Sequence, residues 1–378
     1  MGYTEKLPSG RWKGTYRTPD GRERSKTFDR KIDADKFWTT AEADKVRGQW
    51  IDPLLGRQIF GDYGAAWRAA QVHDEATAAM VERTLRLHIL PTFGSRPLAA
   101  VRPSEIQAWV KSRSDALAPS SLKVAYRWMG AVFNAGVTDG IIFRSPCRGI
   151  RLPVEDATPV VPLATEQVLA VVDAVPAGYR ALTVMAAATG LRQGEAFGVT
   201  IDHLDFLRRS VRVEQQMKYL PPRTPFLARP KTTASLRTVP LPDVALEAAA
   251  EHLRRWPATT AVPALSGRDE LLVFTNVTGG PIARNGFNKA WRRAVKAAGL
   301  PEGTGYHELR HYYASLLIAS GASVKVVQAC LGHKSALETL DTYGHLWPDS
   351  EDQTRRAVDV ALGGLAASPR PVEGSQVL

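Results

Sequence analysis

The chain has 378 residues, enough for two or three domains, and it carries a formal net charge of +11 with a pI of about 9.7. An apolar fraction of 44% with 23% charged residues is ordinary for a globular protein that buries real cores and excludes a disordered chain. So large a positive excess favours a polyanionic partner, most often nucleic acid, whereas a basic surface without such a partner is the alternative.

The cysteine content and the length of the apolar runs argue against a secreted, a metal-binding and a membrane protein. Two cysteines, Cys147 and Cys330, lie far apart, which excludes a disulfide framework and a cysteine-rich metal site. The N-terminal segment MGYTEKLPSGRWKG has no apolar core of a signal peptide. The longest uncharged apolar run, residues 181–191, is shorter than the roughly 20 residues that span a membrane. We therefore expect a protein of the cytoplasm that does not act at a membrane.

Residues 1–52 form the first predicted unit. The segments 11–17 and 22–28 alternate basic and aromatic residues around a turn, which predicts a β-hairpin, and residues 1–7 add a third strand. Residues 33–47 have apolar positions at helical spacing. A three-stranded sheet with one helix could lie in a DNA groove, although a small sheet with a solvated basic face is the alternative. Six bases of the strands and turn are the candidate contacts: Arg11, Lys13, Arg17, Arg22, Arg24 and Lys26.

Residues 57–150 form the second predicted unit. Four stretches with apolar positions three and four residues apart, bounded by proline and glycine, predict a bundle of four or five helices. Its bases could face DNA or only solvent. The proline-rich stretch 151–165 that follows predicts an interdomain linker.

Residues 165–350 predict a mixed, mainly helical domain with a small antiparallel sheet. Helices are expected at 165–175, 178–188, 194–199, 285–298 and from 306 onward, and strands near 210–218, 236–241 and 271–275. Residues 351–378 form a tail without periodicity after 364. Within the tail, residues 357–365 favour a short helix that could dock on a neighbouring protomer. The predicted fold class is therefore α+β with several domains.

Four of the eight histidines fall near the C-terminus, together with an arginine and a tyrosine. They occupy three segments: His307-Glu308-Leu309-Arg310-His311, Leu331-Gly332-His333 and Asp341-Thr342-Tyr343-Gly344-His345. His307, Arg310 and His311 are spaced i, i+3 and i+4, so they share a helix face. Histidines beside an arginine suggest a site for a phosphate, whereas histidines packed in a core are the alternative.

The rest of this C-terminal cluster lies outside that helix. Gly332 is typical of the residue after a helix, which puts His333 in a loop. Tyr343 follows in a short segment without a strong helix signal. A zinc site is disfavoured, because neither a cysteine nor a closely spaced carboxylate joins the histidines and Arg310 would repel a cation.

Two upstream segments carry further candidate residues. In Gly190-Leu191-Arg192-Gln193-Gly194-Glu195, one helix ends and another begins with Arg192 and Glu195 one turn apart. A carboxylate can hold an arginine in the fixed pose that a phosphate clamp needs, although an ordinary surface pair is the alternative. Residues 229–241 predict a hairpin with Lys231 near its turn, where a solvated lysine is the commoner case.

These segments, in this order, resemble the motifs of the tyrosine recombinase (phage integrase) family, over residues 165–350. Each segment alone is a weak signal, but five of them in the right order are specific. They resemble the first arginine box, the β-hairpin lysine motif, the H-x-x-R-H box and the last two elements of the family: Gly190 to Glu195, Pro230 to Leu241, His307 to His311, Leu331 to His333, and Tyr343.

The first two units fit the same resemblance. Residues 57–150 resemble the family's core-binding domain, and residues 1–52 resemble the arm-binding domain of integrases that hold two DNA sites. The resemblance implies a site-specific DNA recombinase, most like a phage or prophage integrase. A type IB topoisomerase and a non-catalytic DNA-binding protein of the same fold are the alternatives.

The resemblance also implies a reaction. Tyr343 would attack a phosphodiester and form a 3′-phosphotyrosine, and the freed 5′-hydroxyl would then attack the phosphotyrosine of a partner strand. His307 would take the phenol proton and Lys231 would protonate the leaving 5′-oxygen. Tyr306, Tyr312 and Tyr313 are rival nucleophiles by residue type only.

The phosphate would be held by arginines. Arg192 and Arg310 would bind its non-bridging oxygens, His333 would add a third donor, and Glu195 would orient Arg192. No metal or other cofactor is needed, because the covalent link conserves the bond energy. The implied partners are duplex DNA with core-type and arm-type attachment sites, a homotetramer on that DNA, a DNA-bending host factor and an excision or directionality factor, in the bacterial cytoplasm or nucleoid.

Overall fold

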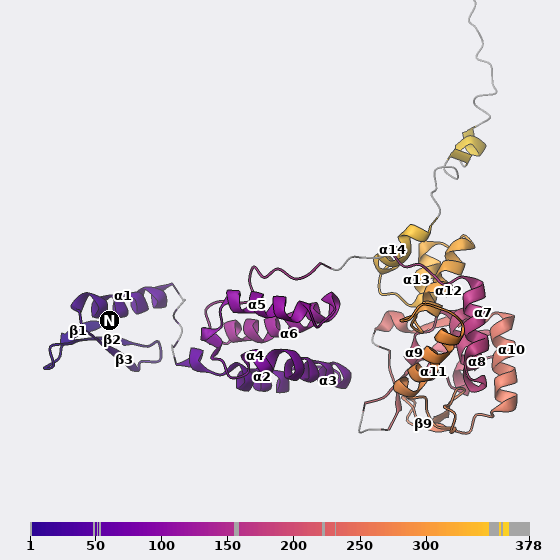
Figure 1. Cartoon of the computed structure of the whole chain (residues 1–378), viewed down its shortest axis with the longest axis horizontal. Helices are drawn as coiled ribbons and strands as arrows, with labels where there is room; N and C mark the ends of the chain where they lie inside the picture. The colour runs from indigo at the N-terminus through magenta and orange to yellow at the C-terminus, as the bar shows by residue number, and fades with distance from the viewer. Residues whose placement is uncertain are drawn as a thin grey trace, which may run out of the picture. The chain divides into compact units, whose positions relative to one another are not determined.

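The computed structural model (Figure 1) describes residues 2–47, 50, 52, 54–154, 159–220, 224–230, 232–347, 355–356 and 358–362. Contacts within the chain divide it into two compact units, residues 1–157 and residues 158–378. No helix among the described residues combines the length and the apolar character that crossing a membrane requires.

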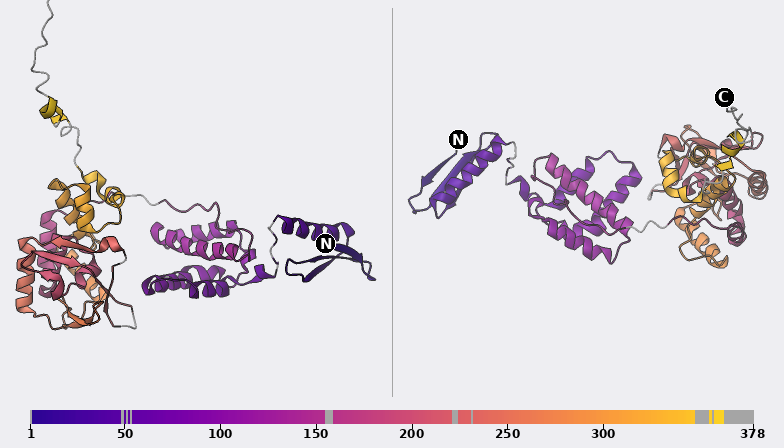
Figure 2. Two further views of the ribbon diagram at one scale, coloured as in Figure 1. Left: turned by 180° about the vertical axis from the view of Figure 1, so that it is seen from behind. Right: turned by 90° about the horizontal axis from the view of Figure 1, so that it is seen from above.

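The N-terminal part of the first unit is a three-stranded sheet backed by one helix, as the sequence predicts. Strands β1 (Tyr3–Lys6), β2 (Trp12–Arg17) and β3 (Glu23–Phe28) pair antiparallel in the order β1-β2-β3. Helix α1 (Lys31–Val46) lies along one face of the sheet (Figure 2).

Aromatic packing and one glycine hold α1 against the strands. The rings of Tyr16 and Phe37 lie 5.3 Å apart, and Tyr16 is buried. A Cβ at Gly14 would stand 2.5 Å from the carbonyl oxygen of Ala34, so only glycine permits so close an approach of helix and sheet. Because Arg24 lies opposite Tyr16 in the register, its side chain leaves the sheet on the face that α1 covers.

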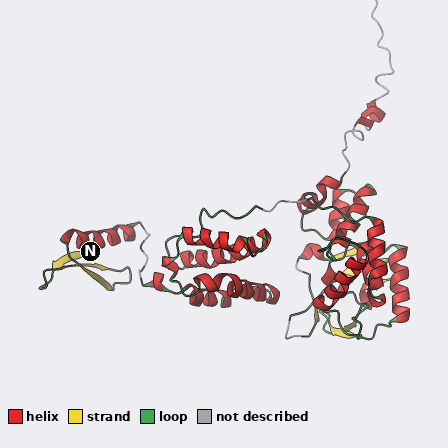
Figure 3. Ribbon diagram, viewed as in Figure 1, coloured by secondary structure: helices red, strands yellow, loops and turns green. Residues whose placement is uncertain are grey.

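The rest of the first unit is the predicted all-helical bundle (Figure 3). Its helices are α2 (Phe60–Ala69), α3 (Glu75–Thr84), α4 (Leu90–Phe93), α5 (Pro103–Ser114) and α6 (Pro119–Thr138). A π-helical turn, Leu85–Ile89, joins α3 to α4, where Pro91 supplies no N–H for a regular ladder. Apolar side chains of α6 form the centre of the bundle's core: Leu122, Ala125, Met129, Val132 and Phe133.

The second unit is mixed and mainly helical, also as predicted. Its helices are α7 (Thr165–Ala174), α8 (Ala177–Thr189), α9 (Gln193–Phe197), α10 (Asp243–Arg255), α11 (Arg284–Ala297), α12 (Glu308–Ala319), α13 (Val324–Leu331) and α14 (Ala336–Tyr343). Helix α8 packs against α7, α10 and α12, so it is the central helix of the unit. Its Leu182, Met185 and Ala186 are fully buried.

Short antiparallel sheets flank these helices. In the first sheet, β5 (Ser210–Val213) lies between β4 (Leu204–Asp205) and β8 (Arg237–Pro240) and pairs with both. Two further sheets have two strands each: β6 (Gln216–Lys218) pairs with β7 (Phe226–Ala228), and β9 (Ala261–Pro263) pairs with β10 (Asp269–Leu271). The predicted strand at 210–218 is thus two strands in different sheets. Between them Gln215 is buried and donates a hydrogen bond to Glu270 at 2.8 Å.

The structure corrects the sequence predictions for this unit in three places. The strand expected near 271–275 lies earlier, as β10, which ends at Leu271. Residues 229–241 do not form a hairpin, because β7 pairs with β6 whereas β8 pairs with β5. Helix α10 was not predicted, since its buried positions are small or polar (Ala245, Ala249 and His252) and give a weak apolar pattern.

Gly190, which ends α8, is a tight packing constraint on the second unit. Its φ of 63° lies in the left-handed region, and a Cβ there would stand 2.5 Å from Cδ1 of Tyr313 on α12. Gly190→Ala should therefore lower the free energy of unfolding by roughly 1–3 kcal/mol, through strain and a displaced α12. Urea denaturation followed by tryptophan fluorescence measures this change.

Gly178 is a matched control on the same helix. A Cβ at Gly178 would meet no atom within 4 Å. Gly178→Ala should leave stability unchanged or raise it by up to about 1 kcal/mol, since alanine is the better helix former. Equal losses for the two variants would contradict the packing described for Gly190.

Candidate active site

The C-terminal end of α13 is the anchor of the site. Gly332, with a φ of 65°, turns the chain out of the helix, which leaves the last carbonyl groups without partners in the helix. Successive carbonyl oxygens of residues 330–332 accept hydrogen bonds from Arg237 (2.7 Å), Arg310 (2.6 Å) and Arg192 (3.3 Å). The negative end of the helix dipole thus stabilises three guanidinium groups together.

Glu195 on α9 fixes two of these arginines from the other side. Its buried carboxylate accepts hydrogen bonds from Nη1 of Arg192 at 3.0 Å and from Nη2 of Arg237 at 2.8 Å. It also accepts from the backbone N–H of Arg192 at 2.9 Å. Burial alone would raise the pKa of Glu195. The pKa is nevertheless lowered, because Arg237 and Arg192 each donate a hydrogen bond to the carboxylate and place a positive charge beside it. The carboxylate is therefore ionised, and its hydrogen bonds hold the side chain and the backbone N–H of Arg192.

Arg237 is a site residue to which the sequence analysis gave no role. Its side chain is almost fully buried, and it joins β8 to Glu195 and to the end of α13. A signal was present in the sequence, because Arg237 alternates with Val239 on one face of a short strand, and Val239 is fully buried. A basic residue on a buried strand face needs a partner, and here Glu195 is that partner.

Arg310 is the most deeply buried of the three arginines. Its Nη1 also donates to the carbonyl oxygen of Gly190 at 2.8 Å. Burial and the nearby charge of Arg192 lower the pKa of Arg310 to about 9, so it remains protonated at neutral pH. In the described part of the chain no carboxylate forms an ion pair with Arg310. A buried guanidinium held by carbonyls alone can bind an external anion.

Tyr343 lies inside this pocket rather than in an irregular segment. It is the last residue of α14, and only 1% of its surface is exposed. Its hydroxyl and Nδ1 of His311 share a hydrogen bond of 2.8 Å. Its ring stacks on the ring of His333, with the two ring centroids 6.3 Å apart. Burial raises the pKa of Tyr343 to about 12, against the opposing charge of Arg310. The phenol is therefore protonated in the resting pocket.

His333 follows Gly332 directly and is buried beside α14. Its Nδ1 shares a hydrogen bond of 2.8 Å with Oγ1 of Thr339, which fixes the ring. Burial and the charge of Arg310 lower the pKa of His333 to about 4, so the ring is neutral at pH 7. Its other nitrogen is thereby available as a neutral donor to an anion.

His307 lies at the start of α12 and is exposed to solvent. Its ring meets that of His311 edge-on, with centroids 4.8 Å apart. Partial desolvation and the charges of His311 and Arg310 lower its pKa. The histidine that contacts the hydroxyl of Tyr343 is His311, which the sequence analysis placed on the same helix face without a role of its own.

The remaining candidates divide into those inside and those outside the described residues. Lys231 lies outside them, in the connection from β7 to β8. The rival nucleophiles Tyr306, Tyr312 and Tyr313 are buried in the core of the unit, and the Tyr312 hydroxyl lies 3.1 Å from that of Thr165. No group of three or more His, Cys, Asp or Glu residues suited to a metal ion occurs in the described ranges.

The six candidate DNA contacts of the N-terminal sheet do not share one face. The strand register puts Lys13 and Arg17 on the open face, and Arg24 and Lys26 on the face toward α1. Five of the six pair with carboxylates: Arg11–Asp29, Lys13–Glu5, Arg17–Glu23, Arg22–Asp20 and Arg24–Asp52. Such partly exposed pairs are worth only about 0–1 kcal/mol, so they leave these bases able to exchange to phosphate.

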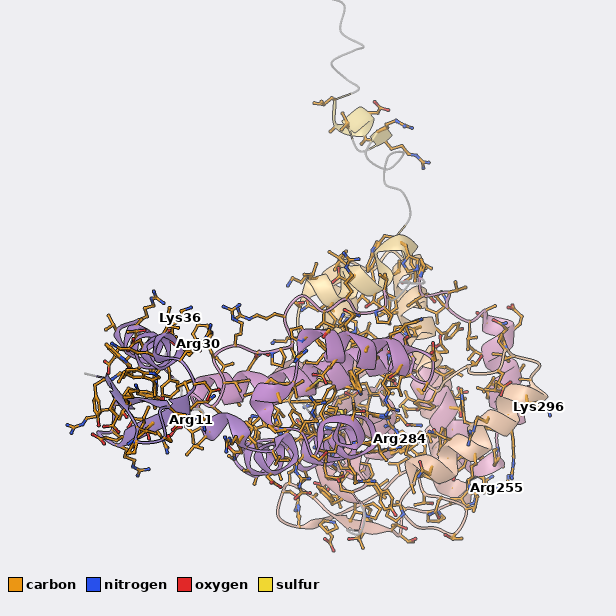
Figure 4. All side chains as sticks on the ribbon, turned by 60° about the vertical axis from the view of Figure 1, so that its left-hand side comes forward. Arg11, Arg30, Lys36, Arg255, Arg284 and Lys296 are labelled. Atoms are coloured by element: carbon orange, nitrogen blue, oxygen red, sulfur yellow. The ribbon has the colours of Figure 1, made fainter. Side chains whose placement is uncertain are left out.

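Helix α11 carries a basic face that the sequence analysis did not single out. Its exposed bases are Arg284, Lys289, Arg292, Arg293 and Lys296, of which the first and the last are labelled in Figure 4. Arg284 donates to Gln193 at 2.8 Å, and Gln193 donates to Asn288 at 3.0 Å. Because Gln193 follows Arg192, these bonds fix the basic face beside the arginine pocket.

Three family models match the chain, one for each part. The Phage integrase family model matches residues 163–349, the model of the phage integrase N-terminal domain matches residues 1–47, and that of the phage integrase central domain matches residues 58–152. The chain belongs to the phage integrase family of tyrosine recombinases, and it is a site-specific DNA recombinase that cleaves and rejoins DNA strands.

Individual proteins agree with this assignment. A protein of Mycobacterium tuberculosis named as a prophage phiRv2 integrase is 27% identical over 352 residues, which cover 89% of each chain. The tyrosine recombinase XerD of Corynebacterium glutamicum is 30% identical over 50% of this chain and 58% of its own. The integrase of Mycobacterium phage D29 is 24% identical over 86% of this chain and 87% of its own.

Solved structures share the fold. The Tn1549 transposon integrase in complex with transposon right end DNA has a TM-score of 0.69 and 21% identity, over 81% of this chain and 100% of its own. A lambda integrase tetramer bound to a Holliday junction has a TM-score of 0.58 and 19% identity, over 89% of this chain and 96% of its own. The predicted α+β multidomain class is thereby confirmed.

The bonds of Glu195 predict a large stability effect. Glu195→Ala leaves the buried guanidinium of Arg237 without its carboxylate, which should cost about 3–5 kcal/mol. Glu247→Ala, at an exposed position of α10, should change stability by no more than about 0.5 kcal/mol. Urea unfolding of both variants measures the difference, and a small effect at Glu195 would contradict its bridging role.

The pKa of His333 predicts a dependence of stability on pH. Because the folded pKa of about 4 lies below the ordinary value of 6.5, the stability associated with neutral His333 is complete above pH 6.5 and is lost as the pH falls toward 4. The full loss is about 3 kcal/mol. His333→Gln should flatten the change in urea midpoint across this window relative to the wild type. An unchanged slope for His333→Gln would refute the assignment.

Proposed function

We propose that this chain is a phage or prophage integrase that cuts and rejoins DNA at attachment sites through a 3′-phosphotyrosine at Tyr343. The observation that carries the proposal is the position of the Tyr343 hydroxyl, hydrogen-bonded to His311 and beside His333 in the arginine pocket. The buried phenol contacts the imidazoles of His311 and His333 and lies within the electrostatic influence of the Arg310 and Arg192 guanidinium groups. These are the groups that an in-line attack on a phosphodiester requires.

Arg192 and Arg310 bind the non-bridging oxygens of the scissile phosphate, and His333 adds a neutral donor. The transition state spreads negative charge over these oxygens, so donors held in advance lower the barrier without reorganisation. By analogy with other preorganised donors, each contributes about 3–4 kcal/mol. Support comes from the fixed guanidinium positions, which depend on Glu195 and on the carbonyls at the end of α13.

Protons move at two positions in the cleavage step. The H-x-x-R-H segment supplies the base for the phenol proton, a role that its place in the motif gives to His307, and Lys231 protonates the 5′-oxygen as it leaves. The reverse transfers accompany rejoining, when a 5′-hydroxyl attacks the phosphotyrosine. The covalent link retains the energy of the broken bond, so neither a metal nor ATP takes part.

Cleavage occurs in cis, by the tyrosine of the protomer whose arginines hold the phosphate. Support comes from the contacts of Tyr343 with His311 and His333 of its own chain. The segment after Tyr343 adds a second tether, since Nε2 of His345 and the carbonyl oxygen of Val160 share a hydrogen bond of 2.8 Å. Leu346 and Trp347 pack against the same core.

Each part of the chain has a DNA role in this proposal. Residues 1–52 bind arm-type sites, residues 57–150 bind the core-type site, and residues 165–350 bind and cleave it. Support comes from the three matching family models and from the exposed bases of α11. Among the structural relatives, a lambda integrase dimer is bound to a core site and a tetramer to a Holliday junction.

The working assembly is a homotetramer on two DNA duplexes in the bacterial cytoplasm or nucleoid. The tail, residues 351–378, supports it through a helical stretch at 358–362, whose Val358, Val360 and Leu362 are exposed and would be buried against a neighbouring protomer. A DNA-bending host factor and an excision or directionality factor complete the proposed set of partners.

Covalent trapping tests the proposal. Incubation with nicked core-site DNA, from which the released 5′ strand diffuses away, should give a denaturant-stable protein–DNA adduct. Tyr343→Phe should form none while keeping the affinity for DNA, because only the nucleophilic oxygen is lost. Tyr312→Phe serves as the control and should still form the adduct. A wild-type protein that forms no adduct, or a Tyr343→Phe variant that does, would overturn the proposal.

Deletion of residues 1–50 tests the arm-site role. The truncated protein should cleave the isolated core site as the whole chain does, since the core-binding and catalytic parts remain. It should lose integration between two complete attachment sites, measured as recombinant product on supercoiled DNA. Undiminished integration would contradict the arm role. Relaxation of supercoils without recombinant product by the whole chain would indicate a topoisomerase instead.

A further inference from the structure

His311 has a contact that no part of the reaction described so far requires specifically. It lies on α12, next to Arg310 and one turn from His307, and it is half-buried. Its Nδ1 shares a hydrogen bond of 2.8 Å with Oη of Tyr343, and the two rings meet at 63° with centroids 5.6 Å apart. Among the described residues, His311 is therefore the hydrogen-bond partner of the Tyr343 hydroxyl.

We propose that His311 is the base that takes the proton of Tyr343 during cleavage and returns it during rejoining. The inference rests on the proposed role of Tyr343 as nucleophile and adds a residue to it. A catalytic base must stand within hydrogen-bond reach of the proton that it takes, and His311 meets this condition, whereas within the described residues no hydrogen bond or ring contact joins His307 to Tyr343.

The surroundings of His311 keep its ring neutral. Burial and the charge of Arg310 lower the pKa of His311 below its ordinary value, so at pH 7 the imidazole has one proton. With that proton on Nε2, the lone pair of Nδ1 accepts the hydrogen bond of the phenol. Titratable and charged groups from four elements act on this pair: His307, Glu308 and Arg310 from α12 and its start, His333 from the loop after α13, Arg192 from the start of α9, and Glu338 from α14.

Proton transfer from a phenol with a pKa of about 12 to a neutral imidazole is unfavourable in the resting pocket. It becomes favourable as the bond to phosphorus forms, because the phenolic oxygen loses basicity while it becomes an ester oxygen. A bound phosphate also offsets the charge of Arg310, which lowers the pKa of His311 in the empty pocket. Transfer is thus coupled to attack.

The step balances in atoms and charge. The bond between Oη of Tyr343 and phosphorus forms, the bond from phosphorus to the 5′-oxygen breaks, and the phenol proton moves to Nδ1 of His311. Lys231 gives a proton to the departing 5′-oxygen. In rejoining, the 5′-hydroxyl attacks, Lys231 regains a proton, and the imidazolium of His311 returns its proton to the departing phenolic oxygen.

His307 then has a different part in the site. Its ring meets the ring of His311 edge-on at 4.8 Å, on the side of α12 that is exposed to solvent. In this position it orients His311 and shields it. It is a positioning residue for the proton transfer, so its replacement should cost less than that of His311.

The test compares two substitutions on two substrates, by the rate of adduct formation on core-site DNA. One substrate is ordinary, and the other has sulfur in place of the bridging 5′-oxygen, so that its leaving group needs no proton. Asparagine keeps an acceptor near the position of Nδ1 but cannot take a proton. His311→Asn should therefore lose about 100-fold or more on both substrates, whereas Lys231→Ala should lose activity on oxygen and regain it on sulfur.

Matched variants keep the result interpretable. His307→Asn should lose no more than about 10-fold, since its ring does not take the proton. Because the pKa of His311 is lowered, the wild-type rate should fall only at a pH below the ordinary imidazole value of 6.5, where protonated His311 can no longer accept. The His311→Asn variant should lack this decrease at acid pH. If His311→Asn fails to bind core-site DNA like the wild type, His311→Gly replaces it, and added imidazole should restore its cleavage but not that of Tyr343→Phe.

The outcomes separate this inference from the proposed function. A wild-type protein without any adduct would overturn the function itself. A wild-type adduct together with a His311→Asn rate within about 3-fold of wild type would overturn only the role of His311. The role of His311 would also be overturned if His307→Asn lost more activity than His311→Asn. It would likewise be overturned if added imidazole did not restore cleavage by His311→Gly.

Discussion

Three guanidinium groups gathered at the end of one short helix are the constraint on which the rest of the site depends. The last carbonyls of α13 accept from Arg237, Arg310 and Arg192, and the single carboxylate of Glu195 forms ion pairs with Arg192 and Arg237. Hydrogen bonds to a helix C-terminus and to a buried carboxylate can hold several cations close together, which Coulomb repulsion alone would separate. The left-handed turns at Gly190 and Gly332 make these carbonyls accessible.

Burial and the same positive charge together set the protonation of the other groups. Burial first, and then the charge, lowers the pKa of each histidine in the pocket, and the charge opposes the rise that burial gives to the pKa of Tyr343. At neutral pH the pocket therefore contains charged arginines, neutral imidazoles and a protonated phenol. This arrangement binds an anion before any proton moves, and it keeps the nucleophile inactive until a phosphate arrives.

The residue types of the site were predictable from the sequence to a greater extent than the hydrogen bonds and strand pairings that connect them. Residue types at short spacing reveal local facts, such as the shared helix face of His307, Arg310 and His311 or the helix end at Gly332. The partners of Arg237 lie on segments far away in the chain, and the pairing of β7 and β8 with different strands depends on long-range contacts. Short motifs contain no information about either. The helical position of Tyr343 was missed because α14 is only eight residues long and is stabilised by packing rather than by propensity.

The central claim is that one residue of the buried pocket, Tyr343, becomes covalently joined to DNA. The most direct measurement is peptide mapping of the trapped adduct by mass spectrometry, after nuclease and protease digestion. The account predicts a nucleotide mass on the phenolic oxygen of the peptide that contains Tyr343. The same mass on a peptide with Tyr306, Tyr312 or Tyr313 would contradict it, since the tyrosine hydroxyl that shares a hydrogen bond with His311 is that of Tyr343.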